Sequence, residues 1–322
     1  MLFDMLRNPK PETRNSKPNP RLIIILGPTC VGKTEMAIKL ATVYGGEIIS
    51  ADSMQVYRYM DIGTAKPTLE ERLSVRHHLI DLVNPDDEFN AAIFIKEAGK
   101  IIQKLTREGK NIFVVGGTGL YIKALLGGLF EGLGADRDLR DSYKDDLKKY
   151  GVNYLFERLK NLDKAAAGKI HPNDVVRIIR ALEIIECTGE SIVKKQEEHR
   201  FGHRSYNYIK IGLLLDRDRL YDKIKMRTDK MIKDGLIEEV EDLLRRGFDE
   251  FLKPMRSMCY KHIVDYIKDK HNIKEAVRLI DRDTRHYAKR QLTWFNREND
   301  IRWYHPQSID LVKDEIENFL DV

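Results

Sequence analysis

The segment from Leu22 to Thr34, LIIILGPTCVGKT, constrains the fold of this chain more than any other stretch. It begins with a run of apolar, mostly β-branched residues, which predicts a short buried strand. The run leads into a glycine loop that matches G-x-x-x-x-G-K-[ST] at every fixed position, and helix-forming residues follow from Glu35 to Ala41. A chance match in a chain of this length is roughly a one-in-a-hundred event, and the flanking strand and helix lower that further. The segment therefore predicts a phosphate-binding loop.

The chemistry of this loop suits a phosphate or a diphosphate. Glycines allow successive backbone N–H groups to curl around an anion, and the N-terminus of the following helix adds partial positive charge. Lys33 supplies a full positive charge, and the Thr34 hydroxyl is placed to hold Mg²⁺. The loop residues predicted to bind a diphosphate are Gly27, Pro28, Thr29, Cys30, Val31, Gly32, Lys33 and Thr34.

Composition favours a soluble globular protein of the cytoplasm. Hydrophobic residues make up 42% of the 322, but the longest aliphatic runs are about five residues, too short to span a bilayer. The N-terminus has no apolar stretch of signal-peptide length. The three cysteines form no C-x-x-C spacing, so we expect reduced thiols, a cytoplasmic location and no membrane association. The net charge of +5 permits an anionic partner without requiring one.

The remaining pattern predicts a parallel sheet flanked by helices, interrupted by an inserted helical domain. Residues 1–20 are rich in proline and predict a disordered extension. Strands and helices alternate up to residue 133, which is typical of a parallel α/β sheet. Residues 134–204 contain no convincing strand, so we assign 21–133 and 205–322 to the core and 134–204 to the insertion. The expected strands are 22–26, 47–51, 80–83, 111–115 and 209–215, and the expected helices are 91–107, 120–126, 138–150, 152–162, 174–187, 219–246, 258–269 and 273–296.

Polar residues after three of the expected strands should converge at one edge of the sheet. In parallel sheets ligands bind beyond the carboxyl ends of the strands, so the phosphate loop, Asp52 and Thr118 are expected in one crevice. An NTPase usually has an acidic residue at the end of a core strand to help hold Mg²⁺, whereas the strand 111–115 ends in Gly-Gly-Thr-Gly. Asp52 or Asp81 could serve instead. The sequence Asp-Ser-Met-Gln at 52–55 suits a general base beside groups that can hold a heteroaromatic ring, although Asp52 could equally cap a turn.

Six blocks of sequence resemble the tRNA dimethylallyltransferase family, also called tRNA isopentenyltransferases. They occur in family order between about residues 21 and 305. The blocks are GPTCVGKT, SADSMQVYRYMDIGTAKP, HHLID, VVGGTGLYI, NDVVRIIRALEIIECTG and TRHYAKRQLTWF. The resemblance implies transfer of a dimethylallyl group from its diphosphate to N6 of the adenosine on the 3′ side of the tRNA anticodon.

The resemblance also implies roles for individual residues. Asp52 would remove a proton from the adenine amine, Lys33 and Mg²⁺ would neutralise the leaving diphosphate, and Thr118 would lie at the reaction centre, or else stabilise its loop. Ser53, Met54 and Gln55 would line the pocket of a base that has swung out of the anticodon arm. Arg217 and Arg227 match family arginines, and one of them would reach the diphosphate; either could instead be a salt-bridge partner.

Contacts with tRNA are expected on three helical segments, one near the C-terminus and two in the insertion. Arg278, Arg282, Arg285 and Lys289 share one helical face, which by itself is more often an ordinary solvated face. The resemblance shifts the interpretation toward tRNA for Lys289, Arg290 and Gln291. In the insertion it implies contacts from Arg140, Val176, Arg177, Ile178, Ile179 and Arg180.

Two departures from the family pattern stand out. Tyr59 and Cys259 replace residues that are usually glycine, and neither is a charged site residue. No C-x₂-C…H-x₃₋₅-H pattern occurs, so we expect the bacterial type without a zinc finger. We expect a monomer. Two other functions remain open: a small-molecule kinase using ATP on the same loop, and an RNA-binding protein whose loop holds an anion structurally.

Overall fold

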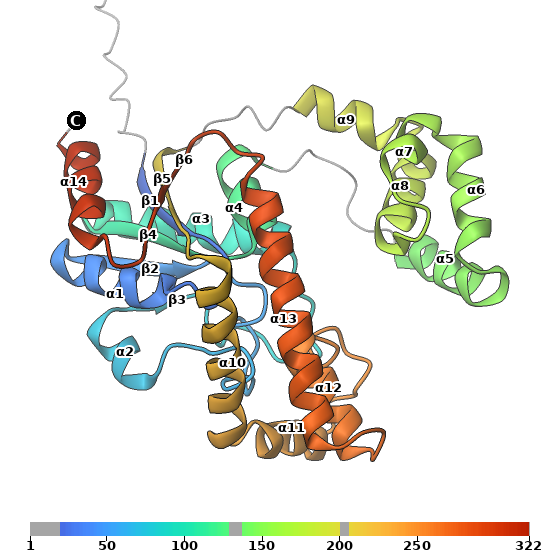
Figure 1. Ribbon diagram of the computed structural model, residues 1–322. Coiled ribbons are helices and arrows are strands. Elements are labelled where there is room, and N and C mark those ends of the chain that lie inside the picture. The colour runs from blue at the N-terminus through green and yellow to red at the C-terminus, as the bar shows by residue number, and fades with distance from the viewer. Residues whose placement is uncertain (1–19, 129–136, 200–205, 322) are drawn as a thin grey trace, which may run out of the picture.

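The structure is a computed structural model that describes residues 20–128, 137–199 and 206–321 (Figure 1). All but the last residue of the expected N-terminal extension therefore lies outside the described residues. The centre of the fold is a six-stranded sheet in the order β3-β2-β4-β1-β5-β6. Every strand pair in the sheet is parallel, which confirms the predicted α/β class. The strands are β1 (Arg21–Leu26), β2 (Gly46–Ser50), β3 (His77–His78), β4 (Asn111–Gly116), β5 (Asn207–Leu213) and β6 (Ile301–Tyr304).

Helices cover both faces of the sheet. In β1, Leu22, Ile24 and Leu26 pack in one core cluster with α3 (Ala91–Arg107) and α4 (Gly119–Gly127). Ile23 and Ile25 point to the other face, where they pack with α1 (Lys33–Val43) and α14 (Ile309–Leu320). A strand buried on both sides has no polar face, which is why β1 is a continuous apolar run and not an alternating one.

The C-terminal part of the chain differs most from expectation. The single helix predicted over 219–246 is wrong: α10 (Arg217–Lys233) and α11 (Leu236–Arg245) are separate, because Gly235 adopts φ of 101° and ends the first helix. The helices α12 (Met258–Ile267) and α13 (Ile273–Phe295) lie within the predicted ranges. They are followed by β6 and α14, neither of which was predicted, since a four-residue edge strand carries little local signal.

The predicted strand 80–83 is also wrong. The third strand along the chain is β3, which pairs with β2 at Ile48 and Ile49. Leu79 and Asp81 have φ of 62° and 56°, in the left-handed region, so the segment that follows β3 cannot continue as a regular strand. The short helix α2 (Leu69–Ser74) was not predicted, although Thr68 and Glu71 form a capping box at its start.

The helices between β4 and β5 form a group with its own core, at a distance from the sheet in Figure 1. They are α5 (Arg137–Tyr150), α6 (Val152–Leu162), α7 (Lys164–Lys169), α8 (Val175–Thr188) and α9 (Ile192–His199). Tyr143, Leu155, Leu159, Ile178 and Leu182 belong to their shared apolar cluster. We call α5–α9 the helical unit. The sequence predicted three of these helices and missed α7 and α9, which are short.

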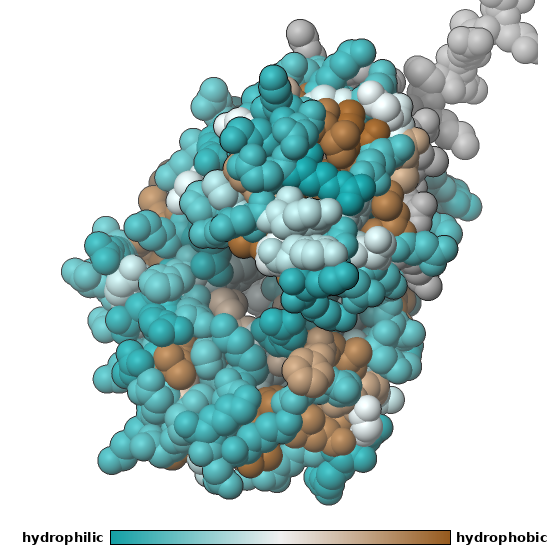
Figure 2. Space-filling model, turned by 90° about the vertical axis from the view of Figure 1, so that its right-hand side faces the viewer, coloured by the Kyte–Doolittle hydropathy of each residue, from teal (hydrophilic) through white to brown (hydrophobic). Residues whose placement is uncertain are grey.

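The surface of the helical unit is mainly polar. Figure 2 turns that side of the molecule toward the viewer, and hydrophilic residues dominate it with only scattered apolar ones. Within the described ranges, no helix combines the length and the apolar character needed to cross a membrane.

The long loop after β2 is anchored by a carboxylate from α11. Glu239 Oε2 accepts hydrogen bonds from the backbone N–H groups of Asp61 and Ile62, both at 2.7 Å. Its Oε1 accepts from the Gly63 N–H at 3.0 Å and from the Tyr260 hydroxyl at 2.6 Å. A Cβ on Gly63 would lie 2.5 Å from the Tyr260 ring, so only glycine fits here. Glu239 thus fixes a loop whose other residues lie near the ends of the strands.

Replacing Glu239 by Gln should destabilise the protein by about 1–3 kcal/mol, because hydrogen bonds to a charged group are stronger than neutral ones and the amide offers one acceptor fewer. The free energy of unfolding in urea measures this. Glu238→Gln is the matched control, since Glu238 is the exposed neighbour on the same helix, and it should change stability by less than about 0.5 kcal/mol. Equal free energies for the two variants would contradict the anchoring role.

Candidate active site

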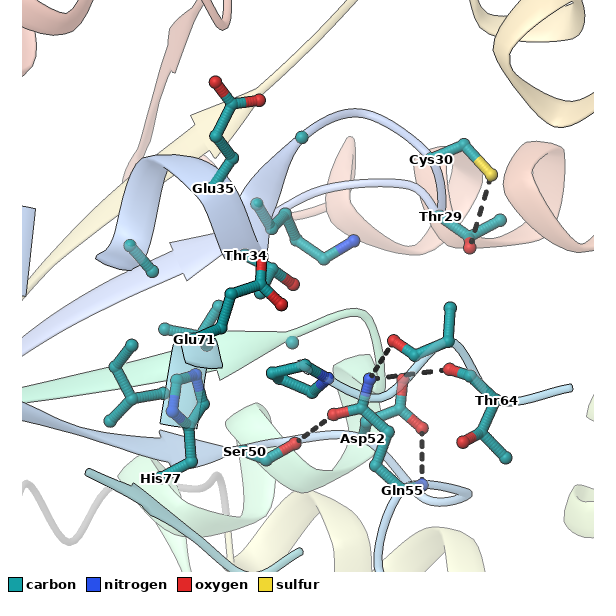
Figure 3. Close-up of a pocket in the computed structure, with 18 of the residues that line it drawn as sticks. Thr29, Cys30, Thr34, Glu35, Ser50, Asp52, Gln55, Thr64, Glu71 and His77 are labelled. Carbon is teal, nitrogen blue, oxygen red and sulfur yellow. Dashed lines mark hydrogen bonds between the residues drawn. The ribbon is translucent and has the colours of Figure 1, made fainter. Parts of the chain in front are cut away.

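A cavity of about 310 Å³ lies at the carboxyl ends of β1, β2 and β4. In Figure 3 the phosphate-loop residues Thr29, Cys30 and Thr34 line one side, and residues that follow β2, among them Asp52 and Gln55, line the other. The predicted meeting of the phosphate loop with Asp52 at one edge of the sheet is confirmed. Thr118 does not line this cavity, but its hydroxyl is hydrogen-bonded to the loop after β2.

The phosphate loop depends on two glycines. Gly27 has φ of 144°, and a Cβ there would lie 2.5 Å from the Leu213 carbonyl oxygen of β5. Gly32 has φ of 106° and precedes the first turn of α1. Pro28 and Val31 are buried within the loop and do not line the cavity, and the Pro28 carbonyl oxygen is already bonded to Lys33. The two glycines therefore provide the backbone conformation of the loop, and the Gly27 position also depends on the close approach of β5.

Lys33 is the principal charge on the phosphate-loop side of the cavity. Its ammonium donates a hydrogen bond to the Pro28 carbonyl oxygen at 2.7 Å. Burial lowers the pKa of Lys33 to about 8, although the nearby Asp52 and Cys30 act to raise it and Arg227 lowers it further. The charged form is costly in this dry site, so an anionic ligand would stabilise it.

Asp52 caps a turn and also lines the cavity. Its Oδ1 accepts hydrogen bonds from the N–H groups of Met54 at 2.8 Å and Gln55 at 3.3 Å. Asp52 therefore does cap this turn, as the alternative interpretation of the sequence predicted. A single carboxylate oxygen accepts both hydrogen bonds. The carboxylate still borders the cavity and is close enough to Lys33 to influence its pKa. The structure thus makes capping compatible with a chemical role.

Thr118 joins the loops that follow β2 and β4. Its hydroxyl accepts a hydrogen bond from the Ser53 N–H at 3.1 Å, and its own N–H donates to the Ala51 carbonyl oxygen at 3.2 Å. A Cβ on Gly116 would overlap that same Ala51 oxygen. The glycines before Thr118 therefore allow backbone to approach backbone, which brings Thr118 next to the Asp52 turn.

Gln55 lines the cavity with its amide already engaged. Its Oε1 accepts a hydrogen bond from the Ser50 hydroxyl at 3.0 Å, and its Nε2 donates to the Ala65 carbonyl oxygen at 3.2 Å (Figure 3). Met54 is half-buried and packs against the core below the sheet edge. Gln55 therefore forms part of the cavity wall with its amide held in place, and Met54 packs behind it in the core.

The two candidate arginines differ. Arg227 lines the cavity, and its Nη1 donates to the Thr29 hydroxyl at 2.9 Å. Arg217 is exposed at the start of α10, with its guanidinium 5.2 Å from the centre of the Tyr221 ring, and it does not line the cavity. Of the two, Arg227 is therefore the one placed for an anion in the cavity.

Asp81, one of the two acids considered for Mg²⁺, is committed to a separate network. Its carboxylate pairs with Lys66 at 2.6 Å and with Arg72 at 2.6 Å. Burial would raise the pKa of Asp81, but the hydrogen bonds from Lys66 and Arg72 hold it below its usual value. Lys66 also donates to the Tyr57 carbonyl oxygen and pairs with Asp61, so it binds the long loop together. Sequence analysis missed Lys66 because its partners lie at irregular spacings.

Two of the residues predicted to face tRNA in the helical unit are buried. Ile178 and Ile179 are 0% and 7% exposed in its apolar cluster, so their side chains serve the core, and their predicted contact with tRNA stays a prediction. Val176 and Arg177 are exposed on the adjoining face of α8. At 100° per residue, Ile178 and Ile179 turn toward the core of the helical unit, and Val176 and Arg177 lie outside the buried sector.

Arg140 and Arg180 are both paired with Glu183. Arg140 binds both carboxylate oxygens, at 2.6 and 3.0 Å, and Arg180 binds one at 3.0 Å. Glu183 is 2% exposed, so a buried charge is compensated by two arginines that remain partly exposed. The pair is thereby held at the surface of the helical unit.

The residues of α13 that were predicted to contact tRNA also differ in their exposure. Lys289 and Arg290 are exposed, whereas Gln291 is 6% exposed, and its amide bonds two loops instead of facing solvent. The structure thus gives Gln291 protein partners, and its predicted contact with tRNA stays a prediction. Arg278 is paired with Glu275 and Arg282 with Asp283, so these members of the basic stripe are partly neutralised.

Tyr59 occupies a backbone conformation that favours glycine. Its φ is 65°, which explains why glycine is usual at this position of the family pattern. The ring stacks on Phe248 with 6.1 Å between centroids, and the Arg246 guanidinium lies 4.5 Å from the ring centre. These contacts offset the backbone strain. Cys259 is a buried core residue near the start of α12 and needs no special backbone angle.

Comparison with known proteins agrees with this geometry. A family model described as IPP transferase matches residues 55–298. The chain is 54% identical over 287 residues to tRNA dimethylallyltransferase 2 of Syntrophus aciditrophicus, a match that covers 89% of this chain and 92% of that protein.

Two solved structures are similar along most of the chain. The tRNA isopentenylpyrophosphate transferase of Bacillus halodurans matches with a TM-score of 0.70 and 40% identity, over 94% of this chain and 97% of that one. A eukaryotic dimethylallyltransferase acting on tRNA matches with a TM-score of 0.79 and 27% identity, over 92% of this chain and 80% of that one. With a matching family model over most of its length and a close relative along nearly all of it, the chain belongs to the tRNA dimethylallyltransferase family.

Proposed function

We propose that the protein transfers a dimethylallyl group from dimethylallyl diphosphate to N6 of the adenosine on the 3′ side of a tRNA anticodon. The observation that carries the proposal is a phosphate loop with a partly buried lysine and a facing carboxylate in one cavity. Membership of the family supports the choice of reaction. The same cavity offers a site for an anionic leaving group and a site for a proton acceptor side by side.

The diphosphate of the donor would bind the phosphate loop. Backbone N–H groups at the start of α1, the Lys33 ammonium and the Arg227 guanidinium all lie on that side of the cavity. Negative charge grows on the diphosphate as its bond to the allyl carbon breaks, and these donors are aimed at where it grows. Their role is to hold the donor and stabilise its departure.

Mg²⁺ is the cofactor of this proposal. Thr34 and Asp52 place a hydroxyl and a carboxylate on the cavity, and Mg²⁺ prefers oxygen ligands, including those of the substrate phosphates. The side chains present therefore fit the ion, with Thr34 as its first protein ligand. When bound, it would add positive charge against the diphosphate oxygens.

The acceptor amine needs a base. The exocyclic nitrogen of adenine attacks the allyl carbon that carries the diphosphate; the C–N bond forms, the C–O bond breaks with its electron pair leaving on the diphosphate, and the amine must lose a proton. Asp52 is the residue proposed to take that proton, because one oxygen holds the turn and the carboxylate still borders the cavity. Ser53, Met54 and Gln55 would shape the pocket of the base, with Thr118 bracing it.

The partner of this reaction is the anticodon arm of a tRNA. Exposed Arg177 on α8, the Arg140 and Arg180 pair, and Lys289 and Arg290 on α13 are the groups proposed to contact its backbone. The protein would act as a monomer in the cytoplasm. A kinase using ATP would need the same loop and could also use the carboxylate, but it would leave the exposed basic groups of the helical unit without a ligand.

The direct test is the intact mass of an anticodon-arm RNA after incubation with dimethylallyl diphosphate and Mg²⁺. The expected result is the gain of one C5 unit on the RNA and on no RNA whose target adenosine is replaced by guanosine. ATP consumption with unmodified RNA would establish the kinase instead, and neither product would leave an RNA-binding protein.

Replacing Asp52 by Asn separates geometry from proton transfer. Asn keeps the oxygen that caps the turn but cannot accept a proton, so the single-turnover rate should fall roughly 10²–10⁴-fold while donor binding changes little. Quenched single-turnover kinetics at several Mg²⁺ concentrations measure this. A rate within a few-fold of wild type would remove Asp52 as the base, and a rate restored by added Mg²⁺ would make it a metal ligand.

Donor binding should weaken as the pH rises through about 8. Burial lowers the pKa of Lys33 to about 8 in the free protein, and only its protonated form attracts the diphosphate. The dissociation constant for dimethylallyl diphosphate, measured by calorimetry, should therefore increase about tenfold per pH unit above that point. Lys33→Arg keeps its charge across this range and should show a flat profile. The same pH dependence in both proteins would assign the effect to another group.

A further inference from the structure

Gln291 joins three segments that are far apart in the sequence. It lies on α13 and is 6% exposed. Its Oε1 accepts a hydrogen bond from the Thr29 N–H of the phosphate loop at 2.8 Å. Its Nε2 donates to the Gly117 carbonyl oxygen in the loop after β4 at 2.9 Å. One side-chain amide therefore uses its acceptor on one loop of the cavity and its donor on the other.

The backbone after β4 packs directly against the side chains of α13 around this amide. A Cβ on Gly117 would overlap Gln291 Nε2, and a Cβ on Gly119 would overlap the Trp294 ring, one turn further along α13. The loop after β4 thus lacks side chains at the two positions where α13 presses against it. Because the helix and the loop are in such close contact, a displacement of the Gln291 side chain would also shift the backbone of the loop after β4.

Thr29 is held from a second helix as well. The Arg227 guanidinium of α10 donates to the Thr29 hydroxyl at 2.9 Å, while Gln291 occupies the Thr29 N–H. That N–H is consequently committed within the protein and is not free to bind a phosphate oxygen. The phosphate loop is therefore set in place by α10 and α13, in addition to its own glycines.

We propose that Gln291 is a positioning residue that holds the phosphate loop and the loop after β4 at a fixed separation, and that it does not contact RNA. The amide is 6% exposed and is bonded to protein groups through both its oxygen and its nitrogen, so it is not accessible to a base or a phosphate. Its neighbours Lys289 and Arg290 face solvent, so RNA binding and loop positioning are carried by adjacent residues of one helix. The inference rests on the proposed function only in taking a diphosphate as the ligand of the cavity.

The test compares Gln291→Met with wild type. Methionine has a similar length but neither hydrogen-bonding group, so the affinity for inorganic pyrophosphate should fall about tenfold, measured by calorimetry. The KM for dimethylallyl diphosphate should rise by a similar factor, with a smaller change in kcat. The dissociation constant for the anticodon-arm RNA, from a filter-binding titration, should stay within twofold of wild type.

Two controls bracket the result. Thr293→Ala changes an exposed residue of the same helix, whose hydroxyl bonds only the Lys289 carbonyl oxygen of its own helix, and should leave pyrophosphate affinity unchanged. Lys289→Ala should weaken RNA binding and leave pyrophosphate affinity unchanged.

Gly117→Ala is a second route to the effect expected of Gln291→Met, because the new Cβ would displace the Gln291 amide. It should reproduce the loss of pyrophosphate affinity, and it replaces Gln291→Met if circular dichroism shows that variant to be unfolded.

Two outcomes would overturn the inference. One is an unchanged pyrophosphate affinity in folded Gln291→Met or Gly117→Ala. The other is a loss of RNA affinity in Gln291→Met as large as in Lys289→Ala. Pyrophosphate binding does not depend on which group is transferred. A wild-type protein that binds pyrophosphate but fails to prenylate RNA would therefore refute the proposed function and leave this comparison intact.

Discussion

The close approach of backbone to backbone at the carboxyl ends of β1, β2 and β4 is the constraint on which the rest of the site depends. Because the strands are parallel, their following loops leave from the same edge of the sheet. The loops meet without intervening side chains: Gly27 lies against the Leu213 carbonyl and Gly116 against the Ala51 carbonyl. Without these glycines the loops would stand apart, and the phosphate loop and Asp52 would not share a cavity.

Once the loops are together, electrostatics and buried hydrogen bonds define what the cavity can hold. Burial lowers the pKa of Lys33, so its charged form would be stabilised by an anion bound in the cavity. The surrounding polar atoms are largely committed elsewhere. Glu239 binds three backbone N–H groups of the loop after β2, and Gln291 binds the two glycine loops. A site whose walls are bonded in this way is pre-organised, which is what differential binding of a transition state requires.

In the helical unit, a buried carboxylate fixes the orientation of two arginines at the surface. Its arginines are not loose charges on a surface, because Arg140 and Arg180 are oriented by a carboxylate that is itself buried. Phosphate contacts of this type position a nucleic acid, whereas recognition of a base depends on the shape of the pocket that receives it. In the proposed function the two tasks would fall on different parts of the chain, the helical unit and α13 for the first and the sheet edge for the second.

The sequence by itself determined the parts of this protein whose interactions are local. The strand, loop and helix from residue 22 to 41 could be predicted because glycine geometry, apolar runs and helix propensity act over a few residues, and the parallel sheet followed from the alternation of such units. Tertiary structure alone decided which way Gln291 points, that Ile178 and Ile179 face a core, and that β6 completes the sheet. It also decided the partners of Glu239 and Lys66. The physical reason is that these outcomes depend on contacts between distant segments, such as Thr29 with Gln291, and no local pattern encodes the neighbour that a side chain will meet once the chain has folded.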